Sequence, residues 1–144
     1  MDLNYIAKGI ELIGTNVKLL NIENNIIDVE RDGKRTFGLE INEPEFQEVE
    51  GAIFGQISID FEVEISQLEE QECKIQLSLE GAFLSQDDMD EETFKELVII
   101  NGAAALIGIA RGKIEAISAN VFNNGKVVIP FVNVIDYYRK IIEE

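Results

Sequence analysis

The sequence predicts a two-layer α+β fold in which an antiparallel sheet has one apolar face covered by helices. Apolar and polar residues alternate through residues 56–65 and again through residues 73–83. The link between these segments, Ser66–Glu72, is short and polar, so the two strands should form an antiparallel hairpin. The chain after Leu84 reads as mainly helical. Because a one-faced sheet needs helices to cover it, these features together indicate an α+β domain.

Further strands are expected before this hairpin. The first lies within residues 10–22, and residues 26–30 continue extended after an Asn-Asn turn. Asp32-Gly33 is a strong hairpin-turn signal and leads into a short strand at residues 35–41. Glu43-Pro44-Glu45 should end that strand, because proline cannot donate to a ladder. The next strand is predicted to run from Val49 to Ile65, with two internal glycines, Gly51 and Gly55, marking a bulge or a sharp bend.

The helical region is expected to begin at the acidic cluster of residues 87–92, since carboxylates favour a helix N-terminus. A calcium loop is the alternative, but the spacing of ligands is interrupted and the central glycine is missing. Asn101-Gly102 is where one helix could stop and a second begin. A last amphipathic helix is predicted at residues 133–144, with four inward residues: Ile135, Tyr138, Ile141 and Ile142.

The helix that begins near Ala103 has a broad apolar face and many small residues, which would let another backbone approach closely. We therefore predict that it packs on its own sheet and also on a second subunit; the alternative is a helix fully buried in a monomer. The predicted interface residues are Ala103, Leu106, Ile109, Ala110 and Lys113.

Composition restricts the function. The chain has 28 acidic and 12 basic residues, a net charge of −16, which disfavours nucleic acid and anionic membranes as partners. It has no histidine, which removes the commonest general base and the usual zinc ligand, and its one cysteine, Cys73, falls on an apolar strand face. Glu62 and Glu64 share a polar strand face and should be solvated. We expect no enzyme activity, no metal and no cofactor.

The longest apolar run, Leu97–Ala110, is shorter than the ~20 residues that cross a bilayer, so no membrane insertion is expected. The sequence also shows no signal peptide, which predicts a cytoplasmic protein.

Several segments carry a resemblance to a known family. Glu80-Gly81-Ala82-Phe83 is similar to a family strand that ends in glycine, a hydrophobic residue and phenylalanine. Residues 107–111 stand in the place of a Phe-Pro-Tyr-Ala-Arg motif, of which Ala110-Arg111 is kept. Residues 17–23 resemble the first strand, and residues 133–138 resemble the start of the last helix. In this order and spacing, over residues 10–142, the chain resembles the SecB family of export chaperones.

The resemblance implies a single domain over residues 1–144, with a four-stranded antiparallel sheet, helices on one face, and assembly as a dimer or a dimer of dimers. Family members bind unfolded precursor polypeptides in apolar, aromatic-lined grooves. The candidate groove residues here are Phe46, Phe54, Phe122, Phe131, Tyr137 and Tyr138. The translocation ATPase SecA docks on acidic residues of the outer sheet face in this family, which implies a docking role for Glu23, Glu62, Glu64 and Glu80.

The favoured function is therefore an ATP-independent holdase that binds unfolded or precursor polypeptides for export, with exposed strand edges adding main-chain hydrogen bonds. Some SecB-like proteins instead serve an antitoxin of a toxin–antitoxin pair, which is the first alternative. A non-catalytic adaptor for one folded partner is the second. A thioesterase or dehydratase of the hot-dog type is the third, and the lack of histidine argues against it.

Overall fold

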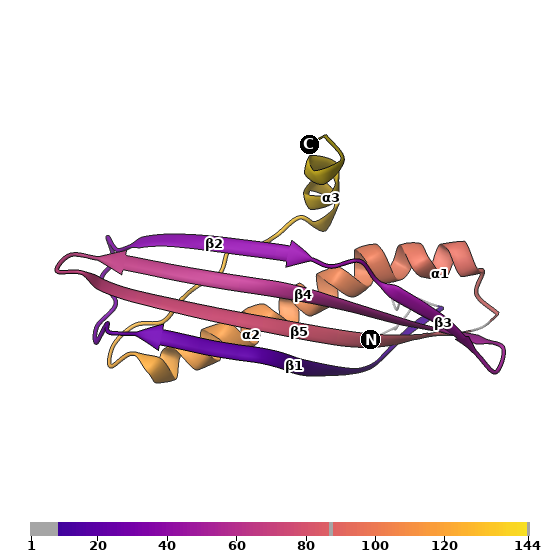
Figure 1. Ribbon diagram of the computed structural model, residues 1–144, viewed down its shortest axis with the longest axis horizontal. Helices are drawn as coiled ribbons and strands as arrows, with labels where there is room; N and C mark the ends of the chain where they lie inside the picture. Colours follow the sequence, from indigo (N-terminus) through magenta and orange to yellow (C-terminus); the bar gives the residue numbers. More distant parts are fainter. Residues whose placement is uncertain (1–8, 87, 144) are drawn as a thin grey trace, which may run out of the picture.

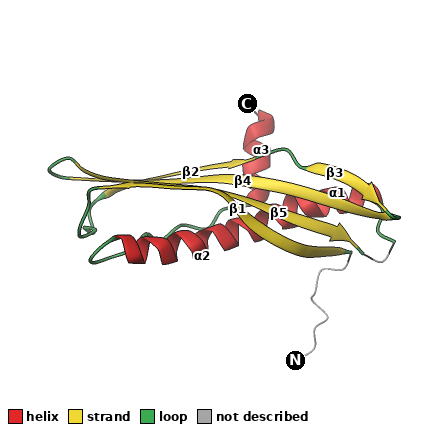
Figure 2. Ribbon diagram, turned by 60° about the horizontal axis from the view of Figure 1, so that its bottom comes forward, coloured by secondary structure: helices red, strands yellow, loops and turns green. Residues whose placement is uncertain are grey.

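The computed structural model describes residues 9–86 and 88–143, and it has two layers, a sheet and a set of helices on one of its faces (Figures 1 and 2). The strands are β1 (Ile10–Asn24), β2 (Lys34–Ile41), β3 (Glu45–Val49), β4 (Ala52–Gln67) and β5 (Gln71–Ser85). The helices are α1 (Glu91–Leu97), η1 (Val98–Gly102), α2 (Ala103–Val121) and α3 (Val134–Glu143). All strand pairs are antiparallel, in the order β1-β5-β4-β2, so the predicted α+β class is confirmed.

The sheet has five strands but is four strands wide, because β2 and β3 lie end to end along β4. Ile41 pairs with Ile59, and Glu45 pairs with Gln56 only a few residues further along β4. Pro44 lies in the gap between β2 and β3, where a residue without an N–H costs no ladder hydrogen bond.

The prediction of one uninterrupted strand from Val49 to Ile65 is wrong. Val49 pairs with Ala52 across a two-residue turn, and both turn residues have positive φ, 48° at Glu50 and 83° at Gly51. Two positive φ values match the right-handed twist of a hairpin, so Gly51 marks a turn instead of a bulge. Residues 26–30 do not form a strand either; they contribute one isolated bridge between Asp28 and Asn124.

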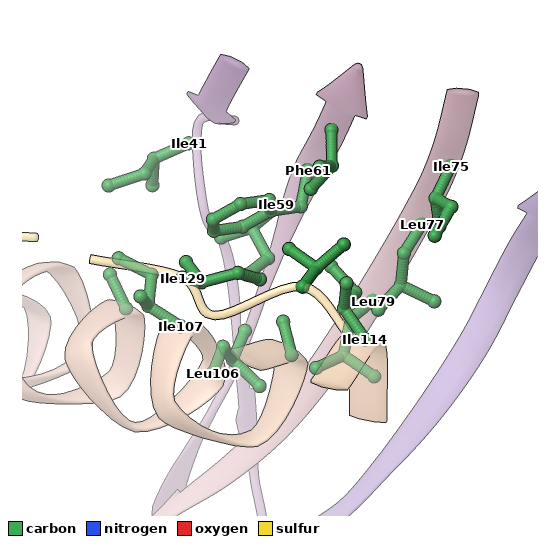
Figure 3. Packing of buried hydrophobic residues seen from close by; sticks show 14 of the residues in the cluster. Ile41, Ile59, Phe61, Ile75, Leu77, Leu79, Leu106, Ile107, Ile114 and Ile129 are labelled. Carbon is green, nitrogen blue, oxygen red and sulfur yellow. The ribbon is translucent and has the colours of Figure 1, made fainter. Parts of the chain in front are cut away.

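The core lies between the inner face of β4 and β5 and the helices. Alternate residues of both strands are almost fully buried, including Ile59, Phe61, Ile75, Leu77 and Leu79. Figure 3 shows several of them facing Leu106, Ile107 and Ile114 of α2. Cys73 belongs to this core, as predicted, and burial raises the pKa of its thiol.

The helical run from α1 to α2 does not break at Asn101-Gly102. It passes instead through a single π-helical segment, η1, where the ring of Phe83 lies so close that a Cβ on Gly102 would be 3.1 Å from it. Asp90 caps the start of α1 by accepting a hydrogen bond from the Thr93 N–H. By length and composition alone, the run Glu91–Val121 could cross a membrane. Of the most apolar window in this run, 39% is buried inside the protein.

The predicted interface on α2 needs correcting at three positions. Ala103, Leu106 and Ala110 are 0% exposed because they pack on the chain's own sheet, so they cannot touch a second subunit in this fold. Ile109 and Lys113 are half-buried, and their part in an interface stays a prediction.

Helix α3 stands away from the body of the molecule, beyond the β2 edge (Figure 1). Its predicted inward face is mostly not inward: Ile135 and Ile141 are each 50% exposed and Ile142 is 83% exposed, while Tyr138 is half-buried. The buried anchor is Val134, at the helix start. Because α3 leaves the sheet after its first turn, none of the described residues packs over its C-terminal end.

Candidate functional site

An extended segment between α2 and α3, residues 125–133, lies across the inner face of the molecule; we call it the strap. Its side chains alternate, with Val127 and Ile129 buried and Val128 exposed. Figure 3 shows Ile129 between Ile59 of the sheet and Ile107 of α2. The strap therefore fills part of the core as a strand would, although no strand pairs with it among the described residues.

The backbone of the strap is held by side chains of α2. Val127 N–H donates to Ser118 Oγ (2.8 Å), and Ile129 N–H donates to Glu115 Oε1 (3.2 Å). The Arg111 guanidinium donates to the Ile129 carbonyl oxygen (3.1 Å). Since these three α2 residues lie on one helix face, they satisfy three backbone groups of the strap without a sheet.

An apolar groove runs beside the strap, between β2 and α3; we call it the β2 groove. Its volume is about 320 Å³. The lining is mostly apolar and includes a few polar residues: Phe37, Gly38, Leu39, Phe61, Ile129, Pro130, Val132, Asn133, Asp136, Tyr137 and Lys140. A groove of this size and polarity can take apolar side chains of a bound chain or ligand.

Tyr137 fixes α3 to the end of β2. Its hydroxyl oxygen accepts a hydrogen bond from the Ile41 backbone N–H (2.9 Å), and its ring meets that of Tyr138 edge to face at 5.4 Å. Burial, and to a lesser extent Tyr137, raise the pKa of Tyr138. Tyr137 thus joins a helix to a strand edge that is far from it in sequence.

Replacing Tyr137 with phenylalanine is expected to lower the free energy of unfolding by about 0.5–1.5 kcal/mol, because the Ile41 N–H loses its acceptor. Tyr138→Phe is the matched control and should cost less, since the Tyr138 hydroxyl accepts no such backbone bond among the described residues. Urea unfolding followed by circular dichroism measures both. Equal losses in the two variants would contradict the role of the Tyr137 hydroxyl.

The six aromatic residues predicted for a groove are not brought together. Tyr137 lines the β2 groove, and the Tyr138 ring contacts the Tyr137 ring. Phe131 is 89% exposed, and its ring centroid lies 4.3 Å from Cζ of the Arg111 guanidinium. Phe122 is 5% exposed and belongs to the core, so its predicted groove role is wrong.

The other two aromatics lie elsewhere on the sheet. Phe46 packs edge to face on Phe94 near α1, at 6.1 Å. Phe54 alternates with buried Gly55 on β4, which puts it on the outer face, away from the groove. Sequence reasoning missed Phe61, Ile129 and Val132; the alternation at Phe37, Leu39 and Ile41 was the one signal that pointed to this edge.

The four acidic residues predicted for docking do share the outer sheet face. Glu62 and Glu64 of β4 both reach Lys74 Nζ of β5, at 3.3 and 3.7 Å, and Glu80 reaches Lys18 Nζ at 3.9 Å. Glu23 pairs with Lys74 in the register between β1 and β5. Their role in docking stays a prediction.

The pair of Glu62 and Lys74 should be visible in a pH titration. A hydrogen bond from Lys74 lowers the pKa of the Glu62 carboxyl below its ordinary 4.5, and the same bond raises the pKa of Lys74 above 10.5. The pair therefore stabilises the folded state between pH 4.5 and pH 10.5. This stabilisation is lost as the pH falls through the lowered pKa of Glu62, and also as the pH rises through the raised pKa of Lys74. Carboxyl-carbon NMR should give a Glu62 midpoint below 4.5, and Lys74→Met should move it upward. A midpoint unchanged in that variant would contradict the pairing.

Strand β1 is exposed along its length and apolar on the helix-facing side. Leu12, Val17, Leu20 and Ile22 pair with buried residues of β5, yet they are 36–45% exposed, because α2 covers mainly β4 and β5. Its outer edge pairs with no strand of the described residues. An edge of this length with apolar side chains is a site for another strand.

No family model and no curated protein matches the chain by sequence. Among solved structures, the chain is similar to a SecB-like chaperone from Mycobacterium tuberculosis, determined in complex with a ChAD peptide from the HigA1 antitoxin. The two superpose with a TM-score of 0.58 and 14% sequence identity, over 87% of this chain and 91% of that one. The likeness establishes a SecB-like fold.

Proposed function

We propose that this protein is a non-catalytic chaperone that holds extended polypeptide segments in the β2 groove. The single observation that carries the proposal is an apolar groove that opens beside a strand edge, in a fold shared with a chaperone solved with a peptide bound. Burial of apolar side chains supplies about 25 cal/mol per Å², without any chemical step. The one carboxylate in the groove, Asp136, forms an ion pair with Arg139 at 3.8 Å.

An antitoxin segment is a client class that the structural neighbour supports, because that neighbour was solved with a peptide from an antitoxin. Export precursors remain the client class that the family resemblance implies. In that case the acidic outer face, with Glu23, Glu62, Glu64 and Glu80, would dock SecA or another partner with a basic surface. A cytoplasmic location is part of this proposal.

The assembly we propose is a symmetric dimer, or a dimer of dimers, in which β1 edges of two copies pair. The pairing would cover Leu12, Val17, Leu20 and Ile22, which the chain leaves partly exposed. Size exclusion with light scattering should give a multiple of the chain mass of 16.2 kDa. A mass of one chain at micromolar concentration would contradict this assembly.

Suppression of aggregation tests the function itself. Insulin reduced with dithiothreitol supplies an aggregating unfolded chain, and turbidity reports its loss from solution. We expect the protein to suppress turbidity in proportion to its concentration. Unchanged turbidity at a several-fold excess of the protein would refute holding.

A pull-down separates the chaperone from the adaptor alternative. A chaperone should capture many unfolded chains in substoichiometric amounts, whereas an adaptor should capture one folded partner at a fixed ratio. Capture of one folded partner alone would favour the adaptor.

A further inference from the structure

We propose that the client enters the β2 groove as an added strand, hydrogen-bonded to the free edge of β2 through the backbone of Phe37 and Leu39. The inference rests on the proposed function and states how the groove binds its client. The expected ligand is an extended peptide with an apolar residue at every second position.

The register of β2 determines which of its backbone groups are free. Asn42 N–H donates to the Ser58 carbonyl oxygen at 3.0 Å, just beyond the paired residues Ile41 and Ile59. Because N–H and C=O groups alternate sides along a strand, even-numbered residues of β2 face β4 and odd-numbered residues face away from it. Phe37 and Leu39 therefore present their N–H and C=O groups outward, at an edge that pairs with no strand among the described residues.

The chain itself occupies the end of this edge. Ile41 N–H is odd-numbered and outward-facing, and it donates to the Tyr137 hydroxyl oxygen at 2.9 Å. The tyrosine oxygen stands where a carbonyl oxygen of an added strand would stand. It satisfies the last outward N–H of β2 and leaves those of Leu39 and Phe37 for a partner.

The side chains of the same residues face the groove. Phe37 and Leu39 line it together with Phe61 and Ile129, so a strand added to β2 would place every second side chain against them. The strap shows that this face of the protein holds an extended segment with alternate side chains buried, Val127 and Ile129, although its N–H groups donate to α2 side chains and not to a strand.

The space beside the β2 edge suits a peptide better than a second copy of the chain. The wall formed by the strap and α3 stands along β2 and leaves a groove of about 320 Å³. That space admits one extended segment, whereas the fully open edge of β1 suits a whole subunit. The net charge of −16 favours a client with neutral or basic flanks.

Amide hydrogen exchange measured by NMR tests the inference directly. The probe is a blocked peptide of about ten residues in which valine alternates with threonine and lysine stands at each end. When the peptide is saturating, exchange at Phe37 and Leu39 should slow by about tenfold or more. Gly38 and Glu40, which face β4, serve as internal controls and should change little.

The outcomes separate the two proposals. If the peptide binds by fluorescence anisotropy but exchange at Phe37 and Leu39 is unchanged, strand addition is wrong and holding stands. If the peptide does not bind and insulin aggregation is not suppressed, the proposed function fails as well. If Phe37 and Leu39 are protected without peptide, and more so at higher protein concentration, the edge is an interface between copies and the inference is overturned.

N-methylated peptides give an independent test. In one version the valine nitrogens are methylated and in the other the threonine nitrogens, so each version removes the N–H groups of one edge of the bound strand. Strand addition predicts that only one of the two methylated peptides binds at least about tenfold more weakly. Whether the valine or the threonine version is the weaker one shows whether the bound strand runs antiparallel or parallel to β2. Equal effects in the two versions would refute an ordered ladder.

A backbone substitution in the protein complements the peptides. Leu39→Pro removes an outward N–H together with the leucine side chain, and the residue before it is Gly38, which tolerates a following proline better than a residue with a Cβ. Leu39→Ala is the control, because it shortens the side chain and keeps the N–H. The proline variant should bind the peptide several-fold more weakly than the alanine variant; equal affinities in two folded variants would contradict the ladder. If the proline variant does not fold, the methylated peptides decide.

Discussion

Replacing Leu106 with alanine is expected to lower the free energy of unfolding by about 2–5 kcal/mol. Leu106 is 0% exposed, and a Cβ placed on Gly81 of β5 would lie 2.6 Å from its Cδ2 atom. The side chain thus packs directly on sheet backbone, which cannot move inward to fill the space that the substitution leaves. This contact joins the two layers near the start of α2.

Urea unfolding measures this loss, with Ile135→Ala as the control. Ile135 is an apolar residue of similar size but is 50% exposed, so its truncation should cost about 0.5 kcal/mol or less. Both variants should be compared at two protein concentrations, since assembly links stability to concentration. A loss below about 1 kcal/mol for Leu106→Ala would contradict the packing of α2 on β5.

Replacing Phe37 with serine is expected to weaken binding of the peptide by about five- to thirty-fold, equivalent to about 1–2 kcal/mol. Phe37 is half-buried on β2 and presents the rest of its ring to the groove. A bound chain would cover that remaining surface, so removal of the ring removes apolar area from the complex. The backbone N–H and C=O of residue 37 are kept in this variant.

Phe54→Ser is the matched control. Phe54 is also a half-buried phenylalanine in the same sheet, but it lies on the outer face. Serine there should cost stability and leave the affinity for the peptide within about twofold of the original. Equal weakening in both variants would show that the effect comes from general destabilisation, and the groove would lose its assignment.

The fold class could be predicted from the sequence because alternation in β4 and β5 is long and regular. The turn at Glu50-Gly51 could not, since glutamate rarely adopts positive φ and apolar residues continue on both sides of it. Likewise, periodicity identifies apolar stripes on α2 but does not say which stripe the sheet covers. The sheet covers Ala103, Leu106 and Ala110, the residues that the sequence predicts at an interface with a second subunit.

The candidate site was harder to predict, for a physical reason. A large aromatic residue looks the same in sequence whether it fills a core, as Phe122 does, or projects into solvent, as Phe131 does. The groove is made where β2 and the strap meet, and these segments are far apart in the chain. The alternation at Phe37 and Leu39 can be seen in the sequence, but the strap residues that line the same groove can be identified only from the tertiary structure.

The pairing of β1 with β5 has a consequence for biosynthesis. Of the five strands, β1 is synthesised first, but its partner β5 (Gln71–Ser85) is synthesised last. β1 therefore cannot pair until the other strands of the sheet have been made. During that interval its leucines and isoleucines are uncovered, and the nascent protein presents the same kind of surface that we propose it recognises in others.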